Sequence, residues 1–168
     1  MPADNEQSLK DYSNGPYFED FNVEQRIKHS TGRTITETDN IWFSLLTCNT
    51  NQIHFNKNYA EENFSDPPFN GKLVVNSFLV LSIVLGISTT DTSRNGIMLG
   101  LKDCKMTHPT FAGDTITAET VVLDKRQSKS HINMGIITVR TTGFKKRRVT
   151  VIEFERSFMV RKTGKEWK

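Results

Sequence analysis

The pattern of apolar and polar positions changes halfway along the chain. The second half contains four long segments rich in Val, Ile, Thr and Phe, namely Gly96 to Met106, Thr115 to Arg126, Ile132 to Phe144 and Val149 to Arg161. Apolar and polar residues alternate over parts of these segments, a two-residue period that is typical of half-buried β-strands. The stretches between them are polar or contain glycine and can turn hairpins. The pattern therefore predicts an antiparallel sheet of four long strands.

The first half carries helix signals instead. Thr and Asp residues at 36–39 are suited to capping a helix whose apolar residues, Trp42 and Phe43 among them, we expect in the core. Residues 56–62 predict a second short helix, which the Pro67-Pro68 loop closes. The run from Leu73 to Gly86 is almost wholly apolar and predicts a helix that is enclosed on all sides. A sheet wrapped around this helix would form an α+β domain.

Length and composition limit the class of protein. A chain of 168 residues with two cysteines and no C-x-x-C motif predicts one reduced domain in the cytoplasm. No apolar run reaches the roughly 20 residues of a membrane span, and a net charge of +3 is too small to predict a nucleic-acid partner. We expect a mobile arm over residues 1–15, one domain over 16–162 and a basic tail over 163–168. The basic run Lys145 to Arg148 fits a solvated hairpin tip better than a phosphate contact.

The four histidines are dispersed along the chain. They form no H-x-x-H or H-x-E pattern, so the sequence predicts no metal site. His29 falls in a polar loop. His108 and His131 have no partner residue at a spacing typical of a catalytic or metal site, which favours structural roles for these two histidines. The sequence contains no G-x-G-x-x-G, Walker A or G-x-S-x-G motif, so nucleotide binding and serine hydrolysis lack support.

One segment resembles a catalytic signature. Residues 47–54, Thr-Cys-Asn-Thr-Asn-Gln-Ile-His, resemble the [ST]-G-D-x-N-P-x-H motif of the MaoC-like (R)-specific enoyl-CoA hydratases, which have the hotdog fold. In order along the chain, residues 32–39 match the family's G-R-T-x-T-E-x-D, residues 75–78 its V-H-G-M and residues 111–115 its F-x-G-D-T. The resemblance covers roughly residues 17–161 and implies an antiparallel sheet wrapped around a long central helix. Asn49 stands where the family has Asp, and Ser77 where it has Gly.

The resemblance implies hydration of an enoyl-CoA thioester. Water attacks the β carbon, a proton reaches the α carbon and enolate charge collects on the thioester oxygen. His54 would transfer the protons, because an amide such as Asn49 can only orient the water. Asn51 would help to position water or substrate. Asn76 and Ser77, at the start of the central helix, would bind the thioester, Ser77 through its backbone N–H.

Coenzyme A enters as part of the substrate, and the sequence implies no other cofactor. Arg94 and Arg126, in or beside loops, are candidate contacts for its phosphates. The Asn-for-Asp form resembles the branch of mesaconyl-CoA and methylmalyl-CoA hydratases, which suggests a short or branched dicarboxylic acyl-CoA. Hotdog domains pair edge to edge, so we expect at least a homodimer.

Two other functions stay open at this point. A hotdog thioesterase would use a carboxylate near the central helix, for which Glu61, Glu62 and Asp66 are candidates. Alternatively, a domain that has lost its Asp could bind acyl-CoA without catalysis. Release of free thiol would identify the thioesterase, and tight binding without turnover would identify the noncatalytic protein.

Overall fold

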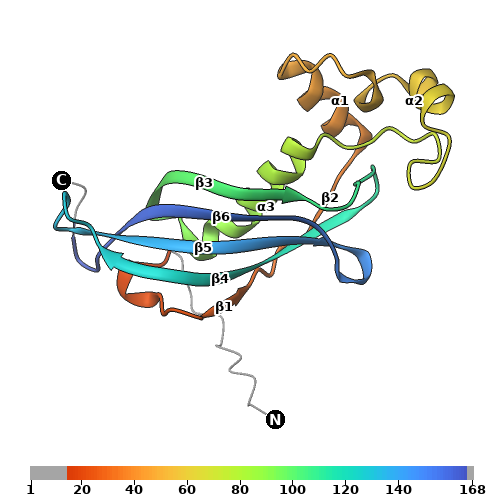
Figure 1. Ribbon diagram of the computed structural model, residues 1–168. Coiled ribbons are helices and arrows are strands. Elements are labelled where there is room, and N and C mark those ends of the chain that lie inside the picture. The colour runs from red at the N-terminus through yellow and green to blue at the C-terminus, as the bar shows by residue number, and fades with distance from the viewer. Residues whose placement is uncertain (1–14, 166–168) are drawn as a thin grey trace, which may run out of the picture.

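The computed structural model describes residues 15–165 and contains one antiparallel sheet (Figure 1). Its strands run in the order β1-β4-β5-β6-β3, with β2 paired to β4 beside this path. The strands are β1 (Arg26–Lys28), β2 (Arg33–Thr34), β3 (Gly96–Met106), β4 (Thr115–Gln127), β5 (Met134–Lys145) and β6 (Val149–Arg161). The helices are α1 (Glu37–Leu46), α2 (Lys57–Asn63) and α3 (Ser77–Thr92). The α+β class and the four predicted long strands are confirmed, while residues 1–14 of the predicted arm lie outside the described part.

The main core lies between α3 and the sheet. Val80 and Val84 of α3 pack in one buried cluster with side chains of β4 and β6, including Ile116 and Phe154. A second cluster lies towards the other end of the sheet, where the rings of Phe21 and Phe158 meet edge to face at 5.8 Å. Burial of each large apolar side chain contributes about 1.5–3 kcal/mol. The packing therefore fixes α3 along the sheet.

The central helix begins four residues later than the sequence pattern predicts. Val74 bridges to Phe111, and the Val75 N–H donates to the Thr110 carbonyl at 2.8 Å, so residues 73–75 are extended. Asn76 then caps the helix, which starts at Ser77. The helix is also not enclosed on all sides, since Phe78 in its first turn is 63% exposed. No helix in the described range is long and apolar enough to cross a membrane.

Helix α1 starts where predicted but faces the other way. The Thr36 hydroxyl accepts from the Asp39 N–H at 3.1 Å, and the Thr36 N–H donates to the Asp39 carboxylate at 2.7 Å, which is a capping box. The prediction of an aromatic core face was wrong: Trp42 is 66% exposed, while the polar Asn40 and Ser44 are buried. Both α1 and α2 lie beyond one end of the sheet, beside the N-terminal end of α3 (Figure 1).

Candidate active site

His54 ends a short 3-10 turn, Gln52–His54, that follows α1. Its ring is half-buried, and Nδ1 lies 2.8 Å from the Val74 carbonyl oxygen. A carbonyl can only accept, so Nδ1 carries the proton and donates it, which fixes the tautomer. Nε2 is then the ring nitrogen left to take up or release a proton. The contact also joins His54 to the segment that leads into α3.

The side chain of Asn40 connects the parts of this site. Asn40 is buried in α1, and its Nδ2 donates to the His54 carbonyl at 2.8 Å and to the Val74 carbonyl at 3.0 Å. Its Oδ1 accepts from the Asn76 N–H at 2.8 Å. One amide thus ties α1, the His54 turn and the start of α3 together. Asn40 was not among the predicted site residues, because nothing in its local spacing distinguishes it from an ordinary helix position.

The backbone N–H of Ser77 is available at the start of α3. In the first turn, the Phe78 N–H donates to the Asn76 side chain at 3.0 Å, and the N–H groups of residues 79 and 80 donate to the Asn76 carbonyl. Within residues 15–165, the Ser77 N–H has no protein acceptor. Helix α3 has 16 residues, so its dipole places partial positive charge here. The position suits an oxygen atom that gains negative charge.

Asn49 and Asn51 shape the chain just before His54. The Asn49 Oδ1 accepts from the Asn51 N–H at 2.9 Å, and the Asn51 Oδ1 accepts from the Ile53 N–H at 3.3 Å. Both oxygens therefore hold local turns, which leaves the two side-chain NH₂ groups as donors. Cys48, before them, adopts a left-handed φ of 55°. Glycine suits that conformation best, which gives a physical reason for glycine in the signature that this segment resembles.

Asn76 caps the start of α3 in the structure, while its contact with substrate stays a prediction. The side chain is buried, its Oδ1 caps the Phe78 N–H, and its Nδ2 lies 3.4 Å from the Ser44 hydroxyl. The inward position of Ser44 on α1 follows from this contact. Asn76 therefore orients the helix start.

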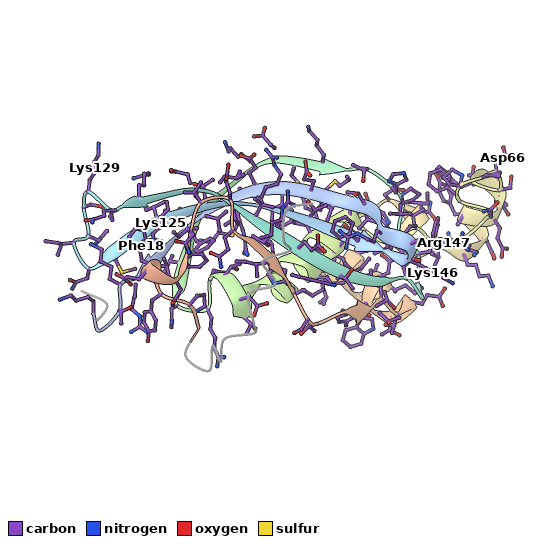
Figure 2. The ribbon with its side chains drawn as sticks, turned by 90° about the horizontal axis from the view of Figure 1, so that it is seen from below. Phe18, Asp66, Lys125, Lys129, Lys146 and Arg147 are labelled. Carbon is purple, nitrogen blue, oxygen red and sulfur yellow. The ribbon has the colours of Figure 1, made fainter. Side chains whose placement is uncertain are left out.

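Arg94 and Arg126 are not brought to the site within this chain. Arg94 follows the C-terminal end of α3, and 16 helical residues span about 24 Å. Arg126 lies near the end of β4, next to Lys125, which Figure 2 shows at the opposite end of the molecule from Lys146 and Arg147. The predicted phosphate contacts therefore gain no support from position. The exposed Lys146 and Arg147, in the turn between β5 and β6, lie instead at the end that carries α1 and α2 (Figures 1 and 2).

His29 lies in the loop between β1 and β2, as predicted, but it does not face solvent there. Its ring is buried, with Nδ1 2.7 Å from the Asp91 carboxylate and Nε2 2.8 Å from the Thr120 hydroxyl. The order carboxylate, imidazole, hydroxyl resembles a catalytic triad. His29 and Thr120 are both sealed from solvent, however, and Thr120 lies 3.0 Å from the Thr141 hydroxyl. The arrangement therefore serves to hold α3 against β4.

Stability should fall as the solution is acidified through the range in which a free histidine titrates. Burial lowers the pKa of His29 from its ordinary value of 6.5, an effect larger than the opposing one of Asp91. Below about pH 6.5 the unfolded chain therefore binds a proton that the folded chain resists, so stability present at pH 7.5 is lost at pH 5.5. Urea denaturation midpoints at the two pH values measure the loss, and His29→Gln should reduce it. An equal loss in that variant would assign the pH dependence to other groups.

The fold and this site define a class, a hotdog domain of the MaoC type. The hotdog prediction is confirmed by a double-hotdog protein of Mycobacterium tuberculosis, which matches 93% of this chain and 47% of its own with a TM-score of 0.79 and 21% identity. The family model described as mesaconyl-CoA hydratase matches residues 7–166. The chain belongs to this mesaconyl-CoA hydratase family.

Two curated relatives are similar over most of the chain. The β-methylmalyl-CoA dehydratase of Chloroflexus aurantiacus is 32% identical over 154 residues, which are 88% of this chain and 41% of the relative. The (R)-specific enoyl-CoA hydratase of Rhodospirillum rubrum is 32% identical over 149 residues, 88% of this chain and 94% of the relative. The chain thus spans about two fifths of the first relative and nearly the whole of the second.

Proposed function

We propose that this protein catalyses the reversible hydration of an enoyl-CoA thioester to a 3-hydroxyacyl-CoA. The observation that carries the proposal is that the His54 ring contacts the short segment that leads into Ser77, so that His54 and the Ser77 N–H are held near each other. His54 holds the Val74 carbonyl, and Ser77 lies three residues further along. This reaction requires two elements, a group that transfers protons and a hydrogen-bond donor that stabilises the oxyanion. Membership of a hydratase family supports the same reaction.

The mechanism follows from these two groups. The thioester oxygen accepts the Ser77 N–H, where the helix dipole favours the enolate charge. His54 Nε2 removes a proton from water as the oxygen attacks the β carbon, and the same imidazolium returns a proton to the α carbon. The NH₂ groups of Asn49 and Asn51 orient the water oxygen. Coenzyme A belongs to the substrate, and no step needs another cofactor.

A thioesterase is less well supported by the positions of the acidic side chains. Glu61 and Glu62 are exposed on α2, and Glu61 pairs with Lys57 at 3.9 Å. Asp66 lies at the outer tip beyond α2, away from the sheet (Figure 2). Hydrolysis would need a carboxylate that directs water onto the thioester carbonyl, and no contact joins these three side chains to the start of α3 among the described residues. Hydration by His54 is therefore the better proposal.

The direct test is to follow the loss of enoyl-thioester absorbance with crotonyl-CoA and mesaconyl-CoA, together with assay of free thiol. Loss of absorbance without thiol release supports the proposal. Release of thiol would identify a thioesterase, and saturable binding without either signal would identify a noncatalytic acyl-CoA-binding protein. Relatives that act on dicarboxylic thioesters lead us to expect mesaconyl-CoA as the better substrate, and the cysteine content leads us to expect the cytoplasm as the compartment.

We also infer that the working unit is at least a homodimer joined along β3. This strand ends the sheet, so its outer edge has no neighbouring strand in residues 15–165. Five of its apolar side chains are exposed, namely Ile97, Met98, Leu99, Leu101 and Met106. A long apolar edge in water is a site for strand pairing. A second copy would cover it by extending the sheet.

Leu99→Lys is expected to convert the dimer to a monomer, because it places a charge in the middle of the paired edge. Light scattering coupled to gel filtration would measure the mass of each species. Ile132→Lys is the matched control, since Ile132 is an exposed apolar residue in the turn between β4 and β5. A wild-type protein that is already monomeric would contradict the inferred pairing.

A further inference from the structure

A small recess lies under the first turn of α3, on the other side of the helix start from His54. Its wall includes Ser77 and Val80 of α3, Met106 of β3, Val151 of β6 and the side chain of His108. Its volume is about 10 Å³, the room that one water molecule needs. It cannot accept a fatty-acyl tail, but it has room for a single oxygen atom of a polar group. We call it the Ser77–His108 recess.

The position of His108 is fixed by its contacts with the start of β6. Nδ1 lies 2.7 Å from the Thr150 carbonyl oxygen, so it carries a proton and donates it. The other ring nitrogen, Nε2, is left for a ligand. The next residue is held as well, since the Lys145 Nζ donates to the Pro109 carbonyl at 2.7 Å. The ring is exposed, so packing alone does not account for this orientation.

The two histidines flank one segment of chain. On one side, His54 Nδ1 donates to the Val74 carbonyl at 2.8 Å. On the other side, the Val75 N–H donates to the Thr110 carbonyl at 2.8 Å, two residues after His108. Ser77, whose N–H would hold the thioester oxygen, follows directly on this segment. A substrate bound at Ser77 therefore has a proton-transfer histidine on one side and a recess with a second histidine on the other.

We propose that His108 binds the free carboxylate of a short dicarboxylic acyl-CoA and so selects that substrate class. The inference rests on the proposed hydratase function and deepens it. Among the described residues that line the recess, His108 is the one that can become charged. A carboxylate that leaves water needs such a partner, because an unpaired charge among apolar groups is strongly disfavoured. The recess otherwise offers Val, Met and Ile side chains together with small hydroxyls.

Size and charge agree with this assignment. In a four-carbon enoyl diacid, three carbon–carbon bonds of about 1.5 Å separate the thioester carbon from the carboxylate carbon, which places them about 4 Å apart. One oxygen of a carboxylate at that distance can enter the recess beside Ser77, whereas a long chain cannot. The neighbouring turn adds positive charge through Lys146 and Arg147, which are exposed. The Lys145 Nζ, beside them, lies 3.3 Å from the Asp114 carboxylate, and this ion pair balances the negative charge of Asp114.

The test compares fumaryl-CoA with crotonyl-CoA, which share a four-carbon enoyl chain and differ in a terminal carboxylate or methyl group. His108→Asn retains an amide near the place of Nδ1 but removes Nε2, and we expect at least about a 10-fold fall in kcat/KM for fumaryl-CoA alone. His108→Gln, which can place an amide near Nε2, should recover part of the loss. His131→Gln, on the distant turn between β4 and β5, is the control and should change neither substrate.

The possible outcomes separate this inference from the proposed function. An equal fall for both substrates would show that His108 supports the site only structurally and would overturn the inference. Unchanged selectivity would overturn it as well. If the wild-type protein hydrates neither thioester, the proposed function fails, and calorimetric titration with the two thioesters still decides the inference. A preference for fumaryl-CoA that His108→Asn removes would support it, and equal affinities in the wild type would exclude it.

Discussion

His54→Ala is expected to lower kcat for enoyl-CoA hydration by about 100-fold or more. General acid–base catalysis contributes about 10²–10⁴-fold in enzymes, and here one imidazole carries both proton transfers. Asn49 cannot replace it, because an amide does not act as a base near neutrality. The loss should fall mainly on kcat, since the thioester oxygen is held by the Ser77 N–H and the substrate should still bind. Steady-state kinetics on the thioester that the wild-type protein uses best would measure the effect.

Two controls distinguish a loss of catalysis from a loss of folding. His131→Ala removes an exposed histidine from the far turn and should leave turnover unchanged. Circular dichroism should show that His54→Ala is folded, although the variant loses the 2.8 Å contact with the Val74 carbonyl. Near-normal turnover in a folded His54→Ala protein would remove the mechanism, and would direct attention to a different base.

The strands and the catalytic segment were predictable because their signals are local. The β3 and β6 bounds agree with the predicted segments, since a two-residue period and the turns around it depend on neighbouring residues. The start of α1 was also correct, because Thr36 and Asp39 form its cap within one turn. The resemblance of residues 47–54 to a known signature located His54, whose ring the structure places against the segment before Ser77.

The errors have a common physical cause in contacts between residues far apart in sequence. Periodicity predicted that Trp42 would point inward, but Asn40 and Ser44 do so, because they bind groups near residues 54 and 76. His29 lies in a loop as predicted, but its burial against Asp91, 62 positions away, was not predicted. None of these partners could be identified from spacing along the chain.

Asn40→Asp is expected to give the largest loss of stability among the site variants, about 3 kcal/mol. The substitution keeps the size and the acceptor for the Asn76 N–H, but it replaces the amide donor by an oxygen. That oxygen then faces the carbonyls of His54 and Val74, which Asn40 now contacts at 2.8 and 3.0 Å. A buried charge that faces two carbonyl oxygens is costly, and the His54 carbonyl loses its side-chain donor, whereas the Val74 carbonyl keeps the His54 Nδ1–H. Urea denaturation at pH 7.5 would measure the change in the free energy of unfolding.

Activity should fall in the same variant even where the protein remains folded. Asn40 fixes the distance between the His54 turn and the start of α3, so its loss moves the proton-transfer group relative to the Ser77 N–H. A displacement of about 1 Å can lower a rate about 100-fold. Asn58→Asp, at an exposed position on α2, adds the same charge without this contact and should change neither stability nor kcat. If Asn40→Asp matched that control in both measurements, the link between α1 and the catalytic segment would have no energetic importance.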